Sequence, residues 1–221
     1  MDESRHSTPG YRDREESRFF QARGQSPEAT WQTLTRELAR VLADALLAFW
    51  RRPLLIDAER VRWWHGAIFA RHFPHDGGHF RKERAFFGVM GRDGRMRRIE
   101  GCQPDAVRRE LTEVCRAFNT GVERLCGPSA AALDRARVVG SLYAGILRVH
   151  PFADGNHRTA FVALSSALWS LGMPAVEFAE DEDMIDHDDA LIPALLSRDG
   201  DIDPFARLLV ARIERAGASE G

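Results

Sequence analysis

The stretch that decides the fold of this chain is His150-Pro151-Phe152-Ala153-Asp154-Gly155-Asn156-His157-Arg158-Thr159. His150 is the type of side chain whose unperturbed pKa lies nearest neutrality, so it can accept a proton from an attacking hydroxyl. Asp154 offers the hard oxygen ligands that Mg²⁺ prefers. Gly155 and Asn156 tolerate positive φ, so backbone N–H groups can turn inward around an anion, and Arg158 adds a permanently charged, forked donor. These residue types in this order predict phosphate chemistry.

A helix is expected directly after this stretch. From Thr159 onward, apolar residues recur at helical spacing, at Phe161, Leu164, Leu168 and Leu171. The loop then lies at a helix N-terminus, where backbone N–H groups and the macrodipole favour anions. The simpler alternative is an ordinary turn between two helices, with Asp-Gly-Asn at its tip.

The same run of residues resembles the signature of the Fic/Doc family, which is H-[PIV]-F-x-[DE]-G-N-G-R-x-x-R in Fic enzymes and H-x-F-x-D-[GA]-N-K-R-T-A in Doc-like toxins. The resemblance implies that His150 is the catalytic base and that Asp154 holds Mg²⁺ against the phosphates of ATP. Four further residues are expected to bind the nucleotide phosphates: Gly155, Asn156, His157 and Arg158.

Two positions depart from the Fic form of the signature. His157 stands where Fic enzymes have glycine and Doc-like proteins have lysine, and Phe161 stands where Fic enzymes have a second arginine. In the family that arginine contacts the terminal phosphates and pairs with an inhibitory glutamate. Because it is missing and His157-Arg158-Thr159-Ala160 is closer to the Doc form, the transferred group stays open between AMP and a phosphoryl group. Glu37 lies in a near match to the inhibitory pattern, and we interpret that segment as a bundle helix only.

A second informative feature is a hairpin between Arg81 and Glu100. Two extended runs flank Asp93-Gly94, and Asp-Gly between such runs is a strong hairpin signal. The preceding Phe73–Arg81 stretch is similar to the family segment that leads into a target-positioning flap. The resemblance implies that the hairpin edge pairs with an extended segment of a target protein, through Phe86, Phe87, Gly88 and Val89. The alternative is a surface hairpin with solvated arginines.

The remaining patterns predict an all-α fold, a Fic-type helical bundle with one β-hairpin flap. Helices are expected near residues 27–50, from 57, at 104–125, at 130–149, from 159, at 183–196 and at 204–213. We expect a flexible N-terminal tail over residues 1–26, a Fido (Fic/Doc) domain over 27–215 and a flexible C-terminus over 216–221.

Composition indicates one globular domain. The chain has 221 residues, 44% hydrophobic and 29% charged, with a net charge of −2, which gives no general field that favours nucleic acid or an anionic membrane. The 3 cysteines match no metal spacing and are odd in number, which favours a reduced, cytoplasmic chain. No apolar run approaches a membrane span. Export as an effector stays open, because such signals need not resemble a secretory peptide.

Two other polar features have structural interpretations. His65 lies in an apolar helix and is expected to be a hydrogen-bonded core histidine. An acidic run is expected to be a solvated face and a helix N-terminus, with a basic partner as the alternative; its members are Glu177, Glu180, Asp181, Glu182 and Asp183, with Asp186, Asp188 and Asp189 beyond. His72, His75 and His79 have no apparent fourth metal ligand, so a metal is not expected there.

Three functions are therefore carried forward. The first is a Fic-type protein adenylyltransferase that moves AMP from ATP to a Ser, Thr or Tyr hydroxyl of a target protein, with Mg²⁺. The second is a Doc-like kinase that transfers the terminal phosphoryl group, as the toxin of a toxin–antitoxin pair, which would add an antitoxin or inhibitory partner. The third is a protein-binding module without chemistry. Neither nucleic acid nor a membrane is expected as a partner.

Overall fold

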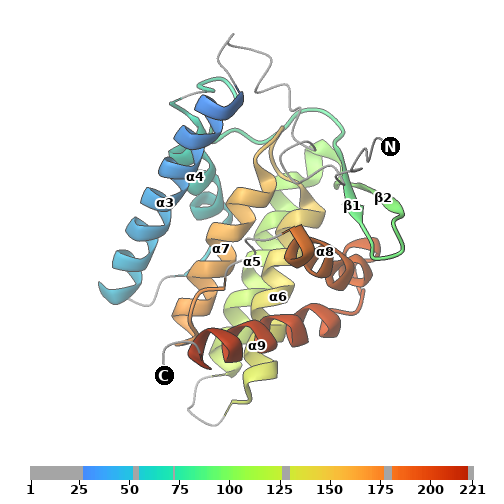
Figure 1. Cartoon of the computed structure of the whole chain (residues 1–221). Coiled ribbons are helices and arrows are strands. Elements are labelled where there is room, and N and C mark those ends of the chain that lie inside the picture. The colour runs from blue at the N-terminus through green and yellow to red at the C-terminus, as the bar shows by residue number, and fades with distance from the viewer. Residues whose placement is uncertain (1–26, 52–54, 72, 126–129, 177–180, 219–221) are drawn as a thin grey trace, which may run out of the picture.

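The computed structural model describes residues 27–51, 55–71, 73–125, 130–176 and 181–218. Within these ranges the fold is all-α apart from one hairpin, as predicted (Figure 1). The helices are α3 (Pro27–Arg51), α4 (Ala58–Phe69), α5 (Val107–Arg124), α6 (Ala132–Val149), α7 (Asn156–Ser170), α8 (Asp181–Leu196) and α9 (Asp203–Ala218), with a 3₁₀ turn η1 (Pro104–Ala106) before α5. The strands are β1 (Phe86–Met90) and β2 (Met96–Glu100).

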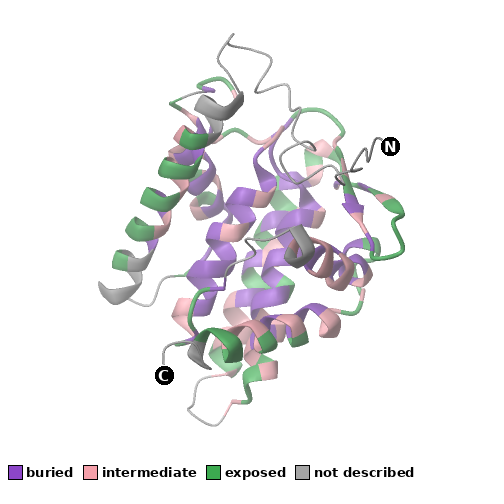
Figure 2. Ribbon diagram, in the orientation of Figure 1, coloured by how far each residue is buried: buried purple, intermediate pink, exposed green. Residues whose placement is uncertain are grey.

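Helices α6 and α7 form the centre of the bundle. They pack against each other, α5 and α9 pack on α6, and α3 packs on α7. Figure 2 shows that these two central helices are largely buried while α3 is exposed along its outer side. Helix α7 buries polar as well as apolar positions, so it presents no clear polar face. The loop between α6 and α7 is therefore attached at both of its ends to buried helices.

Local signals explain several helix ends. Asp57 is the N-cap of α4, and its side chain accepts a hydrogen bond from the Arg60 backbone N–H at 2.7 Å. Pro104 occupies the first turn of η1, where its missing N–H costs nothing. The predicted start of the helix at 57 is confirmed to within one residue.

The motif helix begins earlier than the apolar spacing predicted. Helix α7 starts at Asn156, three residues before Thr159, because Gly155 adopts a left-handed conformation (φ 73°) that turns the chain into the helix. The Thr159 N–H already donates to the Gly155 carbonyl at 3.1 Å. The phosphate-chemistry residues 156–158 thus form the first helical turn rather than a preceding loop.

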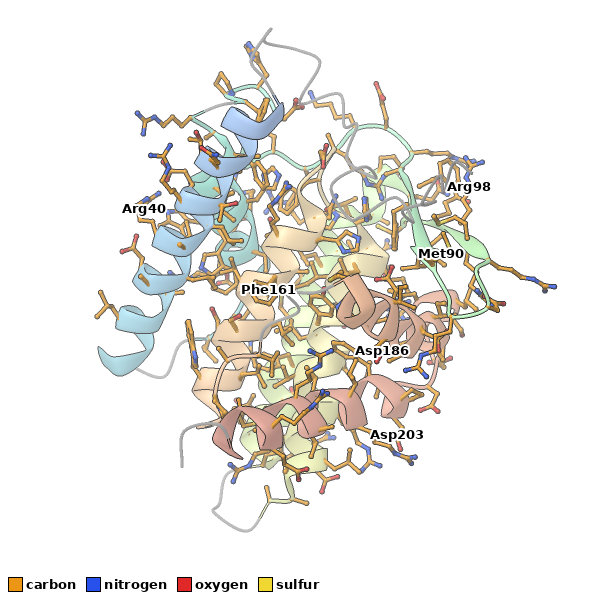
Figure 3. The ribbon with its side chains drawn as sticks, viewed as in Figure 1. Arg40, Met90, Arg98, Phe161, Asp186 and Asp203 are labelled. Carbon is orange, nitrogen blue, oxygen red and sulfur yellow. The ribbon has the colours of Figure 1, made fainter. Side chains whose placement is uncertain are left out.

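The hairpin, Phe86–Glu100, is called the flap below. Its strands pair antiparallel, with Phe87 opposite Ile99 and Val89 opposite Arg97. The turn lies at Asp93-Gly94, where Gly94 has φ 70°. One side of the flap lies against α8, as Figure 3 shows for Met90 and Asp186.

The structure describes the region of the predicted C-terminal domain end but neither of the two predicted flexible ends in full. The tail over residues 1–26 lies outside the described residues. Helix α9 continues to Ala218, past residue 215, where the sequence placed the end of the domain. Residues 219–221 lie outside the described part. No helix within the described ranges is long and apolar enough to cross a membrane.

Candidate active site

His150 is the C-cap of α6 and has a left-handed backbone, φ 49° and ψ 61°. It is the single non-glycine residue with positive φ in the described ranges. Such a conformation is unfavourable for most L-residues and is retained where the surroundings fix it. Here it ends α6 and turns the chain into the motif loop, residues 150–155, which connects α6 to α7.

The imidazole of His150 is buried and has a defined tautomer. Its Nδ1 lies 3.3 Å from the Leu147 carbonyl oxygen, and since a carbonyl can only accept, Nδ1 carries the proton and Nε2 keeps its lone pair. The Phe87 ring of the flap stacks on it with centroids 4.5 Å apart and planes at 7°. Burial, and then the neighbouring His157, lower the pKa of His150 to about 3. His150 is therefore neutral at physiological pH, in the form that accepts a proton at Nε2.

Arg81 holds the backbone on which His150 stands. Its guanidinium donates to the carbonyl oxygens of His150 at 2.6 Å, Val149 at 3.1 Å and Glu83 at 2.7 Å, and also to that of Cys102. The Arg81 N–H donates to the Pro151 carbonyl at 3.0 Å. The last carbonyls of α6 thereby gain partners that an α-helix cannot supply at its own C-terminus. Sequence reasoning assigned Arg81 no role beyond its place in the stretch before the hairpin.

His65 links three segments of the site. The Gly78 N–H donates to His65 Nδ1 at 2.9 Å, so Nε2 carries the proton and donates to the Asp154 carbonyl at 3.0 Å. Its ring also stacks on Phe152, with centroids 3.8 Å apart and planes at 8°. Burial lowers the pKa of His65 to about 3. The prediction of a hydrogen-bonded core histidine is confirmed, and its partners belong to the motif loop and to the segment before the flap.

Asn156 closes the motif loop with its side chain. Its Oδ1 accepts the Phe152 N–H at 2.9 Å and its Nδ2 donates to the Phe152 carbonyl at 3.0 Å. Phe152 itself is fully buried, so its ring anchors the motif loop by packing into the core. The side-chain amide of Asn156 thus holds the loop closed, while its backbone N–H lies in the first turn of α7.

Gly155 is required at the start of α7. A Cβ atom there would lie 2.4 Å from carbons of the Phe69 ring, and the residue has φ 73°. The close approach of α4 therefore excludes any side chain at this position. The resulting first turn of α7 presents the backbone N–H groups of residues 156–158, which have no acceptor within the helix.

Asp154 is the residue on the motif loop expected to hold Mg²⁺. Its Oδ1 accepts the Gly155 N–H at 2.5 Å, which orients the carboxylate beside the helix N-terminus. Mg²⁺ in nucleotide sites is commonly held by one or two carboxylates together with phosphates and water, so a single well-oriented carboxylate fits it. Among the described residues no group of three or more His, Cys, Asp and Glu could hold a metal ion. His75 and His79 were not expected to form such a site, and His72 lies outside the described residues.

The two remaining phosphate-site residues lie on the first turn of α7. Arg158 is 8% exposed, and its guanidinium carbon lies 5.9 Å from the centre of the Phe69 ring. His157 is partly exposed, and its ring meets Phe87 edge-on with centroids 6.1 Å apart. The structure thus gathers His150, Asp154, Gly155 and these two residues at one loop.

Phe161 occupies the place of the second signature arginine. It packs against the hydrophobic core from α7 (Figure 3), so this position supplies no cation to the site. Glu37 lies within α3 and pairs with Arg40 at 3.0 Å and with Arg71 at 3.5 Å. The interpretation of this segment as a bundle helix is confirmed.

The predicted target-binding residues divide between the two faces of the flap. Val89 is buried and Phe87 points to His150, whereas Phe86 and Gly88 are exposed. The Arg98 guanidinium carbon lies 3.9 Å from the centre of the Phe86 ring. Phe87 therefore belongs to the chemical site as well as to the flap.

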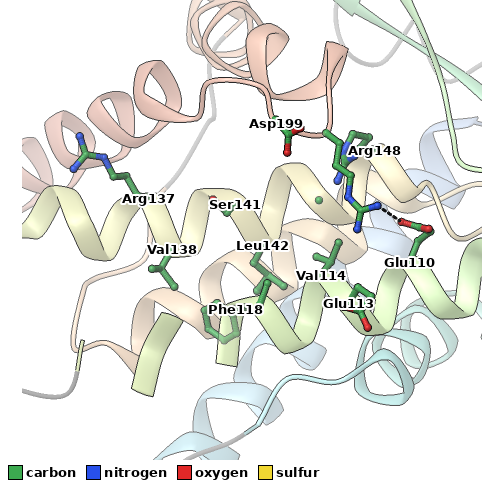
Figure 4. Close-up of a pocket in the computed structure, with 13 residues that line it drawn as sticks. Glu110, Glu113, Val114, Phe118, Arg137, Val138, Ser141, Leu142, Arg148 and Asp199 are labelled. Carbon is green, nitrogen blue, oxygen red and sulfur yellow. Dashed lines mark ion pairs between the residues drawn. The ribbon is translucent and has the colours of Figure 1, made fainter. Parts of the chain in front are cut away.

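A groove between α5 and α6 lies apart from the motif loop. It has a volume of about 410 Å³, an apolar floor that includes Val114, Phe118 and Leu142, and charged residues at its rim (Figure 4). Arg198 lies 3.8 Å from Glu110 there. None of the predicted site residues lines this groove, so the motif loop remains the candidate active site.

The described features define a helical domain with a buried neutral histidine, a carboxylate and a helix N-terminus at one loop, covered by a β-hairpin. A family model described as the Fic/DOC family matches residues 55–168, just over half of the chain. The chain belongs to this family, as the motif resemblance predicted. A search of curated proteins finds no match.

Solved structures with the same fold include several Fic-domain proteins. Fic-1 of C. elegans (residues 134–508, E274G) matches with a TM-score of 0.58 and 22% identity over 80% of this chain and 48% of that one. A Fic-domain signalling protein from Bacteroides thetaiotaomicron matches with a TM-score of 0.63 and 17% identity, over 89% and 75%. BepC, a VirB-translocated effector from Bartonella tribocorum with bound AMPPNP, matches with a TM-score of 0.59 and 16% identity, over 85% and 87%. The chain spans about half the length of the nematode protein, and at these identities the matches establish the fold.

Proposed function

We propose that the protein is a Fic-type adenylyltransferase that transfers AMP from ATP to a Ser, Thr or Tyr hydroxyl of a target protein. The observation that carries the proposal is the neutral His150, whose Nδ1 proton is committed to Leu147 and whose Nε2 lies at the same loop as the N-terminus of α7. A base next to an anion-binding helix terminus suits attack of a hydroxyl on a phosphate. The AMPPNP bound to BepC, a protein of the same fold, supports ATP as the nucleotide.

In the proposed reaction the target hydroxyl oxygen attacks the α-phosphorus of ATP. Its proton passes to His150 Nε2, the bond from the α-phosphorus to the bridging oxygen breaks, and pyrophosphate leaves with the electron pair. The backbone N–H groups of the first turn of α7 and the Arg158 guanidinium stabilise the charge on the phosphate oxygens. Mg²⁺, held by Asp154, would neutralise phosphate charge and orient the nucleotide.

The flap is the proposed site of target recognition. An extended target segment that pairs with the edge of β1 would lie next to Phe87, the ring that stacks on His150. Phe87 covers the imidazole in this structure, so the acceptor side chain would displace it or insert beside it. The partner class is therefore a protein with a hydroxyl in an extended or extendable segment.

Phe161 favours a second candidate function, a Doc-like kinase. Because this residue packs into the core instead of supplying a cation, the terminal phosphates lack the arginine that orients ATP in Fic enzymes. A nucleotide bound in the reverse sense would place the γ-phosphorus before the base. The target hydroxyl oxygen would then attack the γ-phosphorus, its proton would pass to His150 Nε2, and ADP would leave with the electron pair of the broken bond to the bridging oxygen.

Doubly labelled ATP separates these functions. The protein is incubated with cell lysate and Mg²⁺, and with ATP labelled at the α-phosphate in one reaction and at the γ-phosphate in the other. His150→Asn removes the base yet tolerates the left-handed backbone, and His75→Asn changes an exposed histidine as the matched control. Protein-bound α-label that requires His150 supports AMP transfer, and γ-label alone supports the kinase. Absence of both labels, together with failure to bind Mg²⁺–ATP, would leave a binding module.

A further inference from the structure

The hydrogen-bond register of the flap shows which backbone groups of β1 face away from β2. The Gly101 N–H donates to the Ala85 carbonyl at 2.9 Å, and the Gly91 N–H donates to the Arg95 carbonyl at 3.2 Å. In an antiparallel ladder, hydrogen-bonded pairs alternate with pairs that are not hydrogen-bonded to each other. The odd-numbered residues of β1 therefore bond to β2, and the even-numbered ones direct their N–H and C=O groups toward the open edge.

Three residues of β1 belong to this open edge: Phe86, Gly88 and Met90. The edge is already occupied at its turn end, because the Met90 N–H donates to Asp188 Oδ2 of α8 at 3.3 Å. Within the described part of the chain, the edge groups of Phe86 and Gly88 have no hydrogen-bond partner. Both residues are also exposed. Another strand could therefore pair with only two residues of this edge, the alternate residues Phe86 and Gly88.

Asp188 is held in place by a buried chain of hydrogen bonds. It is 3% exposed, and its Oδ1 accepts from His187 Nδ1 at 3.2 Å. His187 Nε2 then accepts from the Tyr143 hydroxyl of α6 at 3.0 Å. Burial alone would raise the pKa of Asp188, but the hydrogen bonds from His187 and from the Met90 N–H outweigh it, and the pKa lies below its usual value. The group that occupies the edge is therefore an ionised carboxylate tied to the helix that carries His150.

The neighbouring acidic residues bind the turn rather than the strand edge. Asp189 Oδ1 accepts the Arg92 N–H at 3.1 Å, and Asp186 Oδ1 accepts from Arg92 Nε at 3.0 Å and from Nη2 at 2.6 Å. Asp186 and Asp189 therefore have a basic partner in the same chain, which is the alternative interpretation of the acidic run; its residues 177–180 lie outside the described residues. The Arg92 contacts fix the tip of the flap on α8 and leave Asp188 as the contact with β1 itself.

We propose that Asp188 ends the usable edge of β1 at Met90 and so sets the register of a target segment that pairs with Phe86 and Gly88. This inference rests on the proposed transfer to a protein hydroxyl. Phe87 lies between the two edge residues and stacks on His150, so the register places the acceptor residue level with Phe87. A segment paired one step nearer the turn would shift the acceptor by two residues, about 7 Å, out of reach of the base.

The chemistry of the edge also indicates the kind of segment it takes. The Arg98 guanidinium lies over the Phe86 ring beside the open edge. An extended segment in which apolar and acidic residues alternate around the acceptor hydroxyl therefore fits this strand. Asp188 acts as a positioning residue, since it contacts the flap and not the reacting atoms.

The test uses the full chain and soluble peptides of alternating valine and glutamate, each with one threonine at a different position. Wild type is compared with Asp188→Ala, with Asp188→Asn, whose amide oxygen can accept the Met90 N–H while its NH2 group donates to the other tautomer of His187, and with Asp189→Ala, which removes a turn contact. Backbone amide NMR follows Phe86, Gly88 and Met90 as peptide is added. Transfer from α-labelled ATP with Mg²⁺ is measured for each threonine position.

In wild type the amides of Phe86 and Gly88 are expected to shift while that of Met90 does not, and one threonine position accepts the label. In Asp188→Ala the Met90 amide is expected to shift as well. The ratio of label on the accepted threonine position to label on the position two residues away falls about tenfold, with KM for ATP unchanged. Asp188→Asn and Asp189→Ala keep the wild-type preference.

A Met90 response in wild type, an unchanged preference in Asp188→Ala, or no edge response to any peptide would overturn the inference. The expected amide responses with no label on any peptide would support the edge assignment and refute the transferase proposal. Label on a peptide without amide shifts at Phe86 and Gly88 would support the transferase proposal and refute the edge assignment.

Discussion

Acidification is expected to destabilise the protein through two buried neutral histidines. His65 and His150 each have a pKa of about 3 in the folded state against a reference value of 6.5. Their ring nitrogens are held by the Gly78 amide, the Asp154 carbonyl and the Leu147 carbonyl. Protonation would desolvate a charge in the core, and at His65 it would also place a proton where the Gly78 N–H now donates.

The sign and size follow from proton linkage. Between the folded pKa and 6.5 the unfolded chain binds more protons than the folded one, so stability is present near neutral pH and is lost as pH falls. At about pH 5 each histidine is charged in the unfolded state and neutral in the folded state. This pH lies about 1.5 units below the unfolded pKa, so each histidine lowers the free energy of unfolding by about 2 kcal/mol. The two together lower the free energy of unfolding by about 4 kcal/mol between about pH 7.5 and pH 5.

Urea unfolding at a series of pH values measures this loss directly. His65→Gln and His150→Asn each remove one titrating group while keeping hydrogen-bonding capacity, and the double variant removes both. Each single variant carries its own cost at neutral pH, but its decline toward pH 5 is expected to be about 2 kcal/mol smaller than that of wild type. An identical pH slope in wild type and the double variant would show that these histidines are not neutral in the folded protein.

Three further changes have defined outcomes. Gly155→Ala is expected to destabilise the protein by about 2–4 kcal/mol in urea unfolding, because the left-handed backbone is strained for alanine and its Cβ would overlap the Phe69 ring. The control Gly172→Ala has φ 69° with open space around it, so it is expected to cost about 1–2 kcal/mol from backbone strain alone. Equal costs would refute the close packing at Gly155. Arg81→Ala leaves several buried carbonyls unpaired and is expected to cost about 3 kcal/mol or more in thermal unfolding, with partial recovery in Arg81→Lys; a loss under about 1 kcal/mol would contradict this. Phe87→Ala uncovers the imidazole, so the pKa of His150 is expected to rise from about 3 toward 6.5 in an NMR titration, and an unmoved pKa would show that Phe87 does not control its burial.

The parts of the fold set by local signals were predictable from the sequence. Asp57 marks a helix start through its own cap, and Asp93-Gly94 marks the flap turn. The motif likewise placed His150, Asp154 and Arg158 at one loop, because their short separation leaves few other arrangements. The start of α7 was missed because Gly155, in its left-handed conformation, turns the chain into the helix at Asn156, before the apolar pattern begins.

The parts that depend on distant contacts could not be predicted from a local pattern. Arg81 finds its acceptors at the end of α6, 68 and 69 residues along the chain, and Met90 finds Asp188 98 residues away. A run of acidic residues looks the same whether it faces solvent or another segment of the chain. A signal was present in Arg92, since a hairpin with several arginines and an acidic helix are complementary, but the sequence does not say that they meet.

One helix carries both Tyr143, which is linked to the flap through His187 and Asp188, and His150, the base of the proposed reaction. Tyr143 lies within α6 and His150 is its C-cap seven residues further on, so the rise of the helix sets them about 10 Å apart along its axis. An α-helix in a packed core does not stretch, so in the proposed reaction this separation keeps a constant distance between the flap contact at Asp188 and the base. A flap that loses this contact would then pair with a target segment in more than one register, while the base itself stays where the end of α6 holds it.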